Sequence, residues 1–313
     1  MKKHALVTGG SGFLGRYVVQ ALQAAGYTVT SLGRKAQDEA DINLHVDLAK
    51  DFELPAQTYH LVVHAAGKAH MVPKTEAEVQ AFHQVNREGT RHLLAALDAQ
   101  PSEHRPEALV LVSTVSVYGK DKGLNLPETT PLESKEPYGL SKQAAEELVR
   151  SWSKQHGIPA TILRLPLVVG HEAPGNLGAM VKAMRKGRFF NIAGGDARRS
   201  MVLAYDVAQA IPNAARFPGT YNLTDGQHPT FAEMAKVIAH VRDYRAARNL
   251  PGVVAGAAGL AGSTLEKITG KRMPFSWRTF RKMTADLTFS DAKAREAWGW
   301  EPHSVLKHPE YWL

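Results

Sequence analysis

The stretch "VTGGSGFLG" near the start of the chain is the feature that most limits how this sequence can fold. It follows a short apolar run and opens a helical pattern over residues 13–26, so it joins a strand to a helix. Its glycines fit G-x-G-x-x-G at Gly10, Gly12 and Gly15, and a seven-residue variant that begins at Gly9. Glycine is needed where a backbone turns sharply and its N–H groups approach a pyrophosphate. The stretch therefore predicts a dinucleotide-binding turn; the alternative is a tight turn without a ligand.

The rest of the first half repeats this alternation of strand and helix. Apolar, β-rich runs predict strands, and stretches with helical spacing predict helices between them. The predicted strands are residues 4–10, 27–34, 59–67, 108–119 and 159–170, and the later helices are 78–100 and 138–157. Continuous apolar strands that alternate with helices indicate a parallel sheet covered on both faces. We therefore predict an α/β fold, with a Rossmann-type doubly wound parallel sheet and a smaller C-terminal substrate-binding lobe.

Around residue 170 the alternation gives way to loops rich in glycine and proline. Helices are predicted at 176–187 and 205–215, a strand at 219–226, and mostly helix from 228 to about 268. We assign residues 1–168 to a nucleotide-binding domain to which 196–225 return, and residues 169–195 and 226–313 to the lobe. Within the lobe, the small apolar residues 250–262 are interpreted as a tightly packed internal helix or loop. Docking on a membrane or a partner helix is the alternative.

Composition narrows the functional classes. The 313 residues include no cysteine, which excludes disulfides, thiolate metal sites and cysteine nucleophiles, and no metal site is predicted. The formal net charge is +8, but the basic residues are scattered, which argues against nucleic acid and favours a small polyanionic substrate. No apolar run is long enough for a membrane span, and the N-terminal run is too short for a signal peptide. Cytoplasm is the expected location.

The end of the second predicted strand bears on the choice of cofactor. An acid that binds the adenosine ribose of NAD usually stands there. This chain has Ser31, Leu32 and Gly33 instead, followed by Arg34 and Lys35. Two cations at that point suit a 2′-phosphate. NADP is therefore favoured, and NAD is the alternative.

Two Tyr-x-x-x-Lys pairs compete for a proton-transfer role. Tyr118 and Lys122 lie in a stretch rich in Gly, Asn and Pro, which predicts a loop without fixed geometry. Tyr138 and Lys142 follow Pro137 in a helical pattern, so their side chains share one helix face. Lys142 can then stabilise the phenolate of Tyr138. Lowering a tyrosine pKa from about 10 to about 7 takes roughly 4 kcal/mol, for which a close ammonium and a positive nicotinamide are suitable sources.

A hydroxyl that holds the substrate oxygen would complete this arrangement. The end of the strand before the loop offers Ser113, Thr114 and Ser116. The order of glycine turn, hydroxyl-bearing strand and Tyr-x-x-x-Lys helix therefore identifies Tyr138 and Lys142 as catalytic.

These motifs resemble the extended short-chain dehydrogenase/reductases, the NAD-dependent epimerase/dehydratase family. The resemblance covers nearly the whole chain and includes "TGGSGFLG", "HVDLA", "VVHAAG", "NREGT", "STVSVYG" and "YGLSK". It implies the catalytic residues Thr114, Tyr138 and Lys142. The cofactor residues that it implies are Gly9, Gly12, Phe13, Leu14, Gly15, Arg34, Asp47, Leu48, Ala65, Ala66, Gly67, Asn86, Tyr138 and Lys142.

The resemblance also narrows the reaction. The family's 4,6-dehydratases carry Asp-Glu after the catalytic threonine, where this chain has Val115 and Ser116, so elimination of water is disfavoured. The stretches "HAAGKAH", "GNLGAM" and "ARRSMVLAYDVAQAI" are similar to bacterial surface-polysaccharide enzymes that act on C4 of UDP-N-acetylhexosamine derivatives. With the cationic turn, this favours an NADPH-dependent 4-keto reductase, and a 4-epimerase with tightly bound NAD is the alternative. A 3β-hydroxysteroid-type dehydrogenase and a non-catalytic binding module fit less well.

For the nucleotide-sugar substrate, the resemblance implies Ser116, Asn176 and Arg199. A second arginine for the diphosphate is less clearly marked, with Arg278 and Arg281 as candidates. The family's tyrosine in the sugar pocket is replaced by Val169.

Two further predictions concern residues outside these sets. His64 and His70 are interpreted as packed, hydrogen-bonded histidines rather than catalytic groups. A homodimer through helices 82–98 and 138–154 is possible by the same resemblance.

Overall fold

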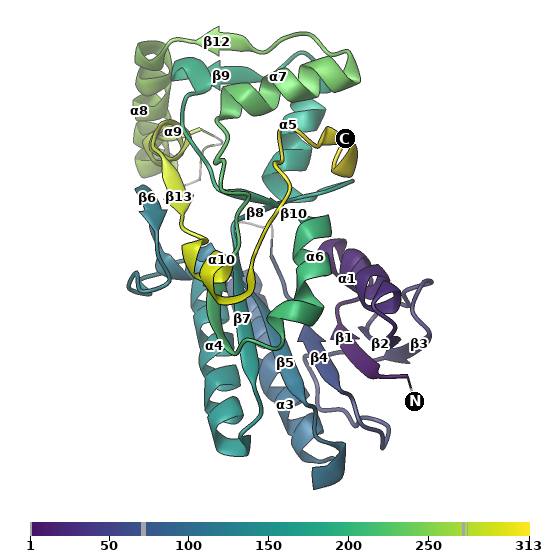
Figure 1. Cartoon of the computed structure of the whole chain (residues 1–313). Helices are drawn as coiled ribbons and strands as arrows, with labels where there is room; N and C mark the ends of the chain where they lie inside the picture. The colour runs from purple at the N-terminus through teal and green to yellow at the C-terminus, as the bar shows by residue number, and fades with distance from the viewer. Residues whose placement is uncertain (1, 70–72, 271–272, 274) are drawn as a thin grey trace.

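The computed structural model describes residues 2–69, 73–270, 273 and 275–313. Within these residues, the centre of the molecule is a seven-stranded parallel sheet with the strand order β11-β7-β5-β4-β1-β2-β3 (Figure 1). Its strands are β1 (His4–Thr8), β2 (Thr28–Gly33), β3 (Ile42–His45), β4 (Leu61–His64), β5 (Ala108–Thr114), β7 (Ala160–Leu165) and β11 (Gly219–Asn222). The order reverses between β1 and β4, which is the place where open α/β sheets bind ligands.

Helices cover both faces of the sheet. On one face, α1 (Phe13–Ala24) and α6 (Ala204–Ala214) bury apolar side chains against β1 and β7. On the other, α3 (Gly89–Asp98) and α4 (Pro137–His156) pack on β4 and β5. The structure confirms the predicted doubly wound sheet.

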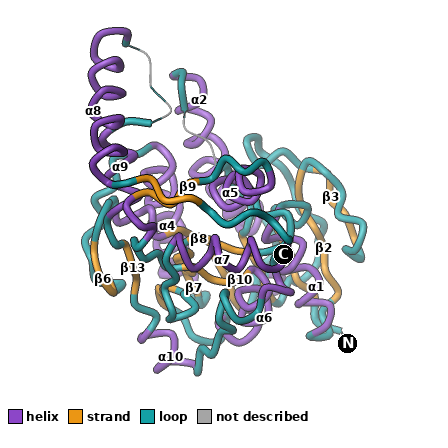
Figure 2. Tube along the Cα trace, turned by 90° about the horizontal axis from the view of Figure 1, so that it is seen from above, coloured by secondary structure: helices purple, strands orange, loops and turns teal. Residues whose placement is uncertain are grey.

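The lobe has a separate core built from methionines and the C-terminal Trp312. Its helices are α5 (Gly175–Arg185), α7 (Phe231–Arg242), α8 (Gly252–Thr269) and α9 (Trp277–Thr284), with α10 (Ala292–Trp298) lying back at the sheet edge. Short parallel strand pairs connect them: β8 (Leu167–Val169) with β10 (Met201–Leu203), β9 (Phe190–Ile192) with β12 (Arg248–Leu250), and β6 (Gly123–Leu126) with β13 (Leu287–Phe289). Figure 2, viewed from above, shows α8 standing out at one corner of the molecule. The division into domains stays a prediction.

Three predicted elements are interrupted. The helix expected at 78–100 consists of α2 (Glu76–Phe82), a π-helical turn (His83–Glu88) and α3. The strand expected at 108–119 ends at Thr114 and continues as a 3₁₀ turn (Val115–Tyr118). The strand expected at 159–170 is divided at Pro166 into β7 and β8, because proline cannot donate a ladder hydrogen bond.

Other elements escaped the sequence analysis. β3 is an edge strand with mostly exposed side chains, so its sequence lacks the apolar pattern of the central strands. Residues 250–262 are predicted to be an internal element, and this prediction is wrong for one face of the helix that they form. They form most of α8, whose glycine face is buried while Val253 on the opposite face is 87% exposed. None of the described helices is long and apolar enough to cross a membrane.

Candidate active site

A cleft of about 1720 Å³ opens between the carboxyl ends of the sheet strands and the lobe. Elements far apart in the sequence form its walls. Of the predicted site residues, the cleft brings together Gly9, Gly12, Phe13, Leu14, Gly15, Arg34, Asp47, Leu48, Ala65, Ala66, Gly67, Thr114, Ser116, Tyr138, Lys142, Asn176 and Arg199. Asn86 is not part of the lining and lies behind it.

The glycine turn fits a dinucleotide phosphate. A Cβ atom at Gly15 would lie 2.0 Å from the carbonyl oxygen of Gly9, so only glycine lets α1 begin this close to the turn. Gly9 has a positive φ of 72°, and a Cβ there would lie 2.7 Å from Cα of Ala66. Gly12 is the N-cap of α1 and supplies no side-chain cap. The first N–H groups of the helix are therefore left for an anion in the cleft.

The wall next to β2 is cationic. Arg34 and Lys35 follow β2, are exposed and line the cleft, whereas Asp38 does not line it. Asp47 and Leu48 follow β3 and form the adjoining part of the wall. This wall combines groups that suit a ribose hydroxyl with groups that suit an added phosphate.

Asn86 ties the loop after β4 to α4. Its Oδ1 accepts a hydrogen bond from Lys68 N at 2.7 Å, and its Nδ2 donates to Lys68 O at 3.1 Å and to Ser141 Oγ at 2.9 Å. The π-helical turn that carries Asn86 adds one residue per turn there and allows this buried position. Asn86 thus holds the cleft wall at Gly67 against the helix that carries Tyr138.

The three predicted catalytic residues come from two neighbouring elements. Thr114 ends β5, and its Oγ1 accepts a hydrogen bond from Ser116 N and donates to Ser116 Oγ, both at 3.2 Å. Tyr138 lies in the first turn of α4, after Pro137. Lys142, one turn later, donates from Nζ to the Val112 carbonyl at 2.8 Å.

Burial controls the protonation of this group. It raises the pKa of Tyr138, while a hydrogen bond with the Thr114 side chain acts in the lowering direction. It also lowers the pKa of Lys142 to about 8, opposed by the negative charge of Glu146. The spacing of Tyr138 and Lys142 on one helix face predicts that Lys142, together with a bound nicotinamide, lowers the pKa of the tyrosine. Within the protein itself the direction is the opposite, because enclosure outweighs the favourable contacts and the ammonium is held by the Val112 carbonyl.

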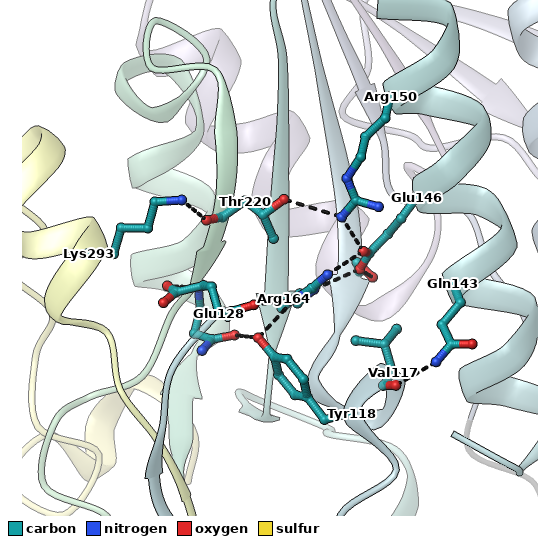
Figure 3. Close-up of polar contacts among 11 residues, drawn as sticks. Val117, Tyr118, Glu128, Gln143, Glu146, Arg150, Arg164, Thr220 and Lys293 are labelled. Carbon is teal, nitrogen blue, oxygen red and sulfur yellow. Dashed lines mark hydrogen bonds and ion pairs between the residues drawn. The ribbon is translucent and has the colours of Figure 1, made fainter. Parts of the chain in front are cut away.

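A buried ion pair supports this wall from behind and was missed by the sequence analysis (Figure 3). Glu146, fully buried one turn after Lys142, accepts hydrogen bonds from Arg164 Nε at 3.0 Å and Arg164 Nη2 at 2.7 Å. Ser113 also lines the cleft, but its hydroxyl donates to the same carboxylate at 2.6 Å and so belongs to this ion-pair network. The available signal was a lone arginine in the apolar strand "TILRLP", since a cation buried there needs an acid partner.

The second Tyr-x-x-x-Lys tyrosine belongs to the same support. Tyr118 is fully buried, donates to Asn222 Oδ1 at 2.7 Å and accepts from Arg164 Nη1 at 3.0 Å. Its hydroxyl faces this network in Figure 3, and Tyr118 does not line the cleft. His64 is likewise structural: its ring nitrogens pair with Thr8 Oγ1 at 2.7 Å and Thr90 Oγ1 at 2.8 Å. His70 lies outside the described residues.

The lobe supplies the far wall of the cleft. Asn176 lies in the first turn of α5. The guanidinium of Arg199 lies 5.5 Å from the ring centre of Phe231 and donates to backbone carbonyls at the end of α9. Arg278 pairs with Glu136 on the surface, and neither Arg278 nor Arg281 lines the cleft. From α9, Thr279, Lys282 and Met283 line it instead. Val169 is fully buried and does not line the cleft, whereas its neighbour Val168 does.

The chain is similar to known proteins over most of its length. Residues 5–223 match the model of the NAD dependent epimerase/dehydratase family. A UDP-glucose 4-epimerase of Vibrio cholerae is 27% identical over 98% of this chain and 93% of its own. The N-acetyl-alpha-D-glucosaminyl-diphospho-ditrans,octacis-undecaprenol 4-epimerase of Escherichia coli O157:H7 is 26% identical over 72% of this chain and 68% of its own.

A solved structure shows the same fold. The UDP-glucuronic acid 4-epimerase of Bacillus cereus, in complex with UDP-glucuronic acid and NAD, superposes with a TM-score of 0.74 at 18% identity, covering 98% of this chain and 97% of that one. The family model spans more than half of this chain. The chain therefore belongs to the NAD-dependent epimerase/dehydratase family of extended short-chain dehydrogenase/reductase enzymes.

Proposed function

We propose that this enzyme interconverts the two C4 epimers of a UDP-hexose or UDP-N-acetylhexosamine with bound NAD. The observation that carries the proposal is a single cleft that holds Thr114, Tyr138 and Lys142 between a glycine turn and the lobe residues Asn176 and Arg199. The relatives named as 4-epimerases support this choice, one of them over nearly the whole chain. A role in surface-polysaccharide synthesis, a cytoplasmic location and a homodimer remain predictions.

The roles of the chain's own residues follow from their positions. Thr114 holds the substrate's C4 oxygen, and Tyr138 accepts or returns the proton of that oxygen. Lys142 holds positive charge beside the tyrosine. NAD, when bound, supplies the hydride acceptor and donor. Because the protein alone raises the pKa of Tyr138, the phenolate needs additional positive charge from the bound nicotinamide. Ser116, Asn176 and Arg199 orient the sugar and its diphosphate.

A 4-keto reductase that consumes NADPH is the second candidate. The observation that favours it is the pair of exposed cations, Arg34 and Lys35, which line the cleft after β2. Elimination of water is disfavoured, because Val115 and Ser116 stand where a dehydratase needs an acid and a base. Asn176 and Arg199 on the substrate wall argue against a steroid-type substrate, and the intact catalytic set argues against a pure binding module.

The deciding experiment is release of nucleotide on heat denaturation of the purified enzyme, combined with turnover of UDP-glucose and UDP-N-acetylglucosamine. Stoichiometric NAD with appearance of the C4 epimer supports the proposal. If the enzyme is purified without nucleotide, binds NADPH more tightly than NADH and forms no epimer, the 4-keto reductase replaces the 4-epimerase as the proposed function.

Two glycine variants control this experiment. Gly15→Ala is expected to lose the nucleotide, because its Cβ would clash with the Gly9 carbonyl. Gly256→Ala is expected to keep it, because the nearest atom to its Cβ is 3.7 Å away.

A further inference from the structure

We propose that one end of the lobe docks on an anionic lipid bilayer surface, through the outward face of α8 and a group of basic side chains beside it. The proposal does not depend on which reaction the cleft catalyses. We call the residues Lys182, Arg185, Lys186, Arg188, Arg245 and Arg248 the basic end.

The outward face of α8 carries five exposed apolar side chains, although Thr264 and Lys267 are also exposed near the end of the helix. Val253, Leu260 and Ile268 are exposed by 87%, 55% and 75%, and Val254 and Leu265 flank them at 54% and 43%. Their spacing keeps them on one side of the helix. The helix has no charged residue before Glu266. Exposed apolar surface of this extent on an otherwise soluble-type fold indicates an interaction site.

The opposite face of α8 fixes this orientation. A Cβ atom at Gly259 would lie 3.3 Å from Cβ of Phe280, and one at Gly262 would lie 2.0 Å from the carbonyl oxygen of Phe275. The contact at Gly262 requires glycine and the one at Gly259 is tight, so α9 and the segment before it pack closely on this face. The larger apolar side chains of α8 cannot turn inward without separating the two helices.

The basic end adjoins the start of α8. Figure 1 shows β9, β12 and α8 at the same end of the molecule, and β12 leads directly into α8. Arg248 of β12 pairs across from the exposed Phe190 of β9. The loop before β12 meets the end of α5, since Met184, Gly187 and Arg245 line the same small depression. Within the described part of the chain, the exposed side chains of the basic end form no ion pair.

An apolar helix face beside a basic end favours a lipid surface over a second copy of the chain. A second copy would offer the basic end few acids from the same surface, since the sequence has only Asp243 and Glu266 in residues 182–190 and 242–269. Anionic phospholipid attracts the cations, and the acyl boundary accepts the apolar face of a helix lying in the interface. Ala183 and Phe189, which lie among the basic residues, also line the cleft. Docking would therefore place the lobe side of the cleft near the bilayer.

Vesicle flotation tests the proposal with the full chain. The probes are vesicles of phosphatidylcholine alone and of phosphatidylcholine mixed with phosphatidylglycerol. We expect binding to the mixed vesicles that weakens with added salt. The triple variant V253S/L260S/I268S should lose at least about tenfold in partitioning. Each neutralised arginine in R245S/R248S should cost about fivefold.

Matched variants elsewhere control for general effects of the substitutions. I42S/L124S/L132S removes exposed apolar side chains from other surfaces, and K50S/K154S removes two exposed cations. Both controls should bind like the wild type, and all variants should keep the wild-type circular dichroism and nucleotide content. No flotation of the wild type, or equal losses in test and control variants, would overturn the proposal. A wild-type dimer that becomes monomeric in V253S/L260S/I268S would replace the lipid with a second copy.

Discussion

Tyr118 and Tyr138 each stand four residues before a lysine, yet the fold gives their hydroxyls different partners. Tyr118 is fixed between Arg164 and Asn222 in the interior. Tyr138 lines the cleft beside Thr114. At the scale of the residue, the role of each Tyr-x-x-x-Lys tyrosine therefore depends on the element that carries it. Helix α4 directs the side chain of Tyr138 into the cleft, and the turn after β5 directs that of Tyr118 into the core.

Tyr138→Phe tests this distinction directly. Because the variant lacks the hydroxyl that moves the proton, kcat should fall by about a thousandfold, while nucleotide content stays at the wild-type level. Tyr118→Phe is the matched control. It should keep turnover but lose about 1 kcal/mol of unfolding free energy, because Arg164 loses a buried acceptor. If Tyr138→Phe turned over as fast as the wild type, the Tyr138 hydroxyl would not be the group that transfers the proton.

His64 makes stability depend on pH. Burial, with a smaller contribution from the charge of Lys142, lowers its pKa from 6.5 to about 3. At a pH between these two pKa values, His64 binds a proton in the unfolded chain but not in the folded chain. The stabilisation is complete above about pH 6.5 and is lost as the pH falls, by about 2 kcal/mol at pH 5. Urea unfolding of the wild type and of His64→Gln, at about pH 6.5 and at about pH 5, measures this loss of stability. Identical pH dependence of the two proteins would contradict the assignment.

At the scale of the element, α4 has two tasks on adjacent turns. One turn presents Tyr138 and Lys142 to the cleft, and the next buries Glu146 against Arg164 of β7. The ion pair joins the helix to β7, which pairs with β5, the strand that ends at Thr114. The negative charge of Glu146 also raises the pKa of Lys142 against the effect of burial.

Glu146→Gln should therefore destabilise the fold strongly. It leaves the buried guanidinium of Arg164 without a counter-charge, which costs about 3–5 kcal/mol. Glu147→Gln, the next residue on the same helix, is exposed and should change the unfolding free energy by less than about 0.5 kcal/mol. Chemical denaturation compares the two variants. A loss below about 1 kcal/mol in Glu146→Gln would contradict the expected dependence of the fold on this ion pair.

At the scale of the whole molecule, the cleft joins the sheet to the lobe. The glycine turn and the strand ends form one wall, while α5 and α9 form the other. A dinucleotide on the first wall and a nucleotide sugar on the second would meet at Thr114.

Hydrogen exchange should separate the two halves of this cleft. Addition of NAD to nucleotide-free enzyme should slow exchange in the turn before α1. Subsequent addition of a UDP-hexose should slow exchange in α5 and α9, because a ligand that binds only the folded form suppresses local opening. Protection by the UDP-hexose that is confined to the sheet side would contradict the assignment of Asn176 and Arg199 to the substrate.

The sequence by itself determined the doubly wound sheet, the glycine turn and the placement of Tyr138 and Lys142 on one helix, whereas the choice of Thr114 over Ser113 and Ser116 rests on the family resemblance. Apolar periodicity and turn chemistry are local, so they are readable without a partner. Two elements are not predicted by these local patterns. β3 is a four-residue edge strand without the continuous apolar run of the central strands, and the π-helical turn around Asn86 leaves no mark in the spacing of apolar residues.

Only the tertiary structure decided what each residue contacts. The Glu146–Arg164 pair joins residues from different elements, and no local pattern specifies such a pairing. The direction of the Tyr138 pKa follows from enclosure by the whole fold. The exposed face of α8 follows from α9 packing on the glycines, which leaves the larger apolar side chains of the same helix outside. Burial and partner choice are properties of contacts distant in sequence, which composition and spacing do not contain.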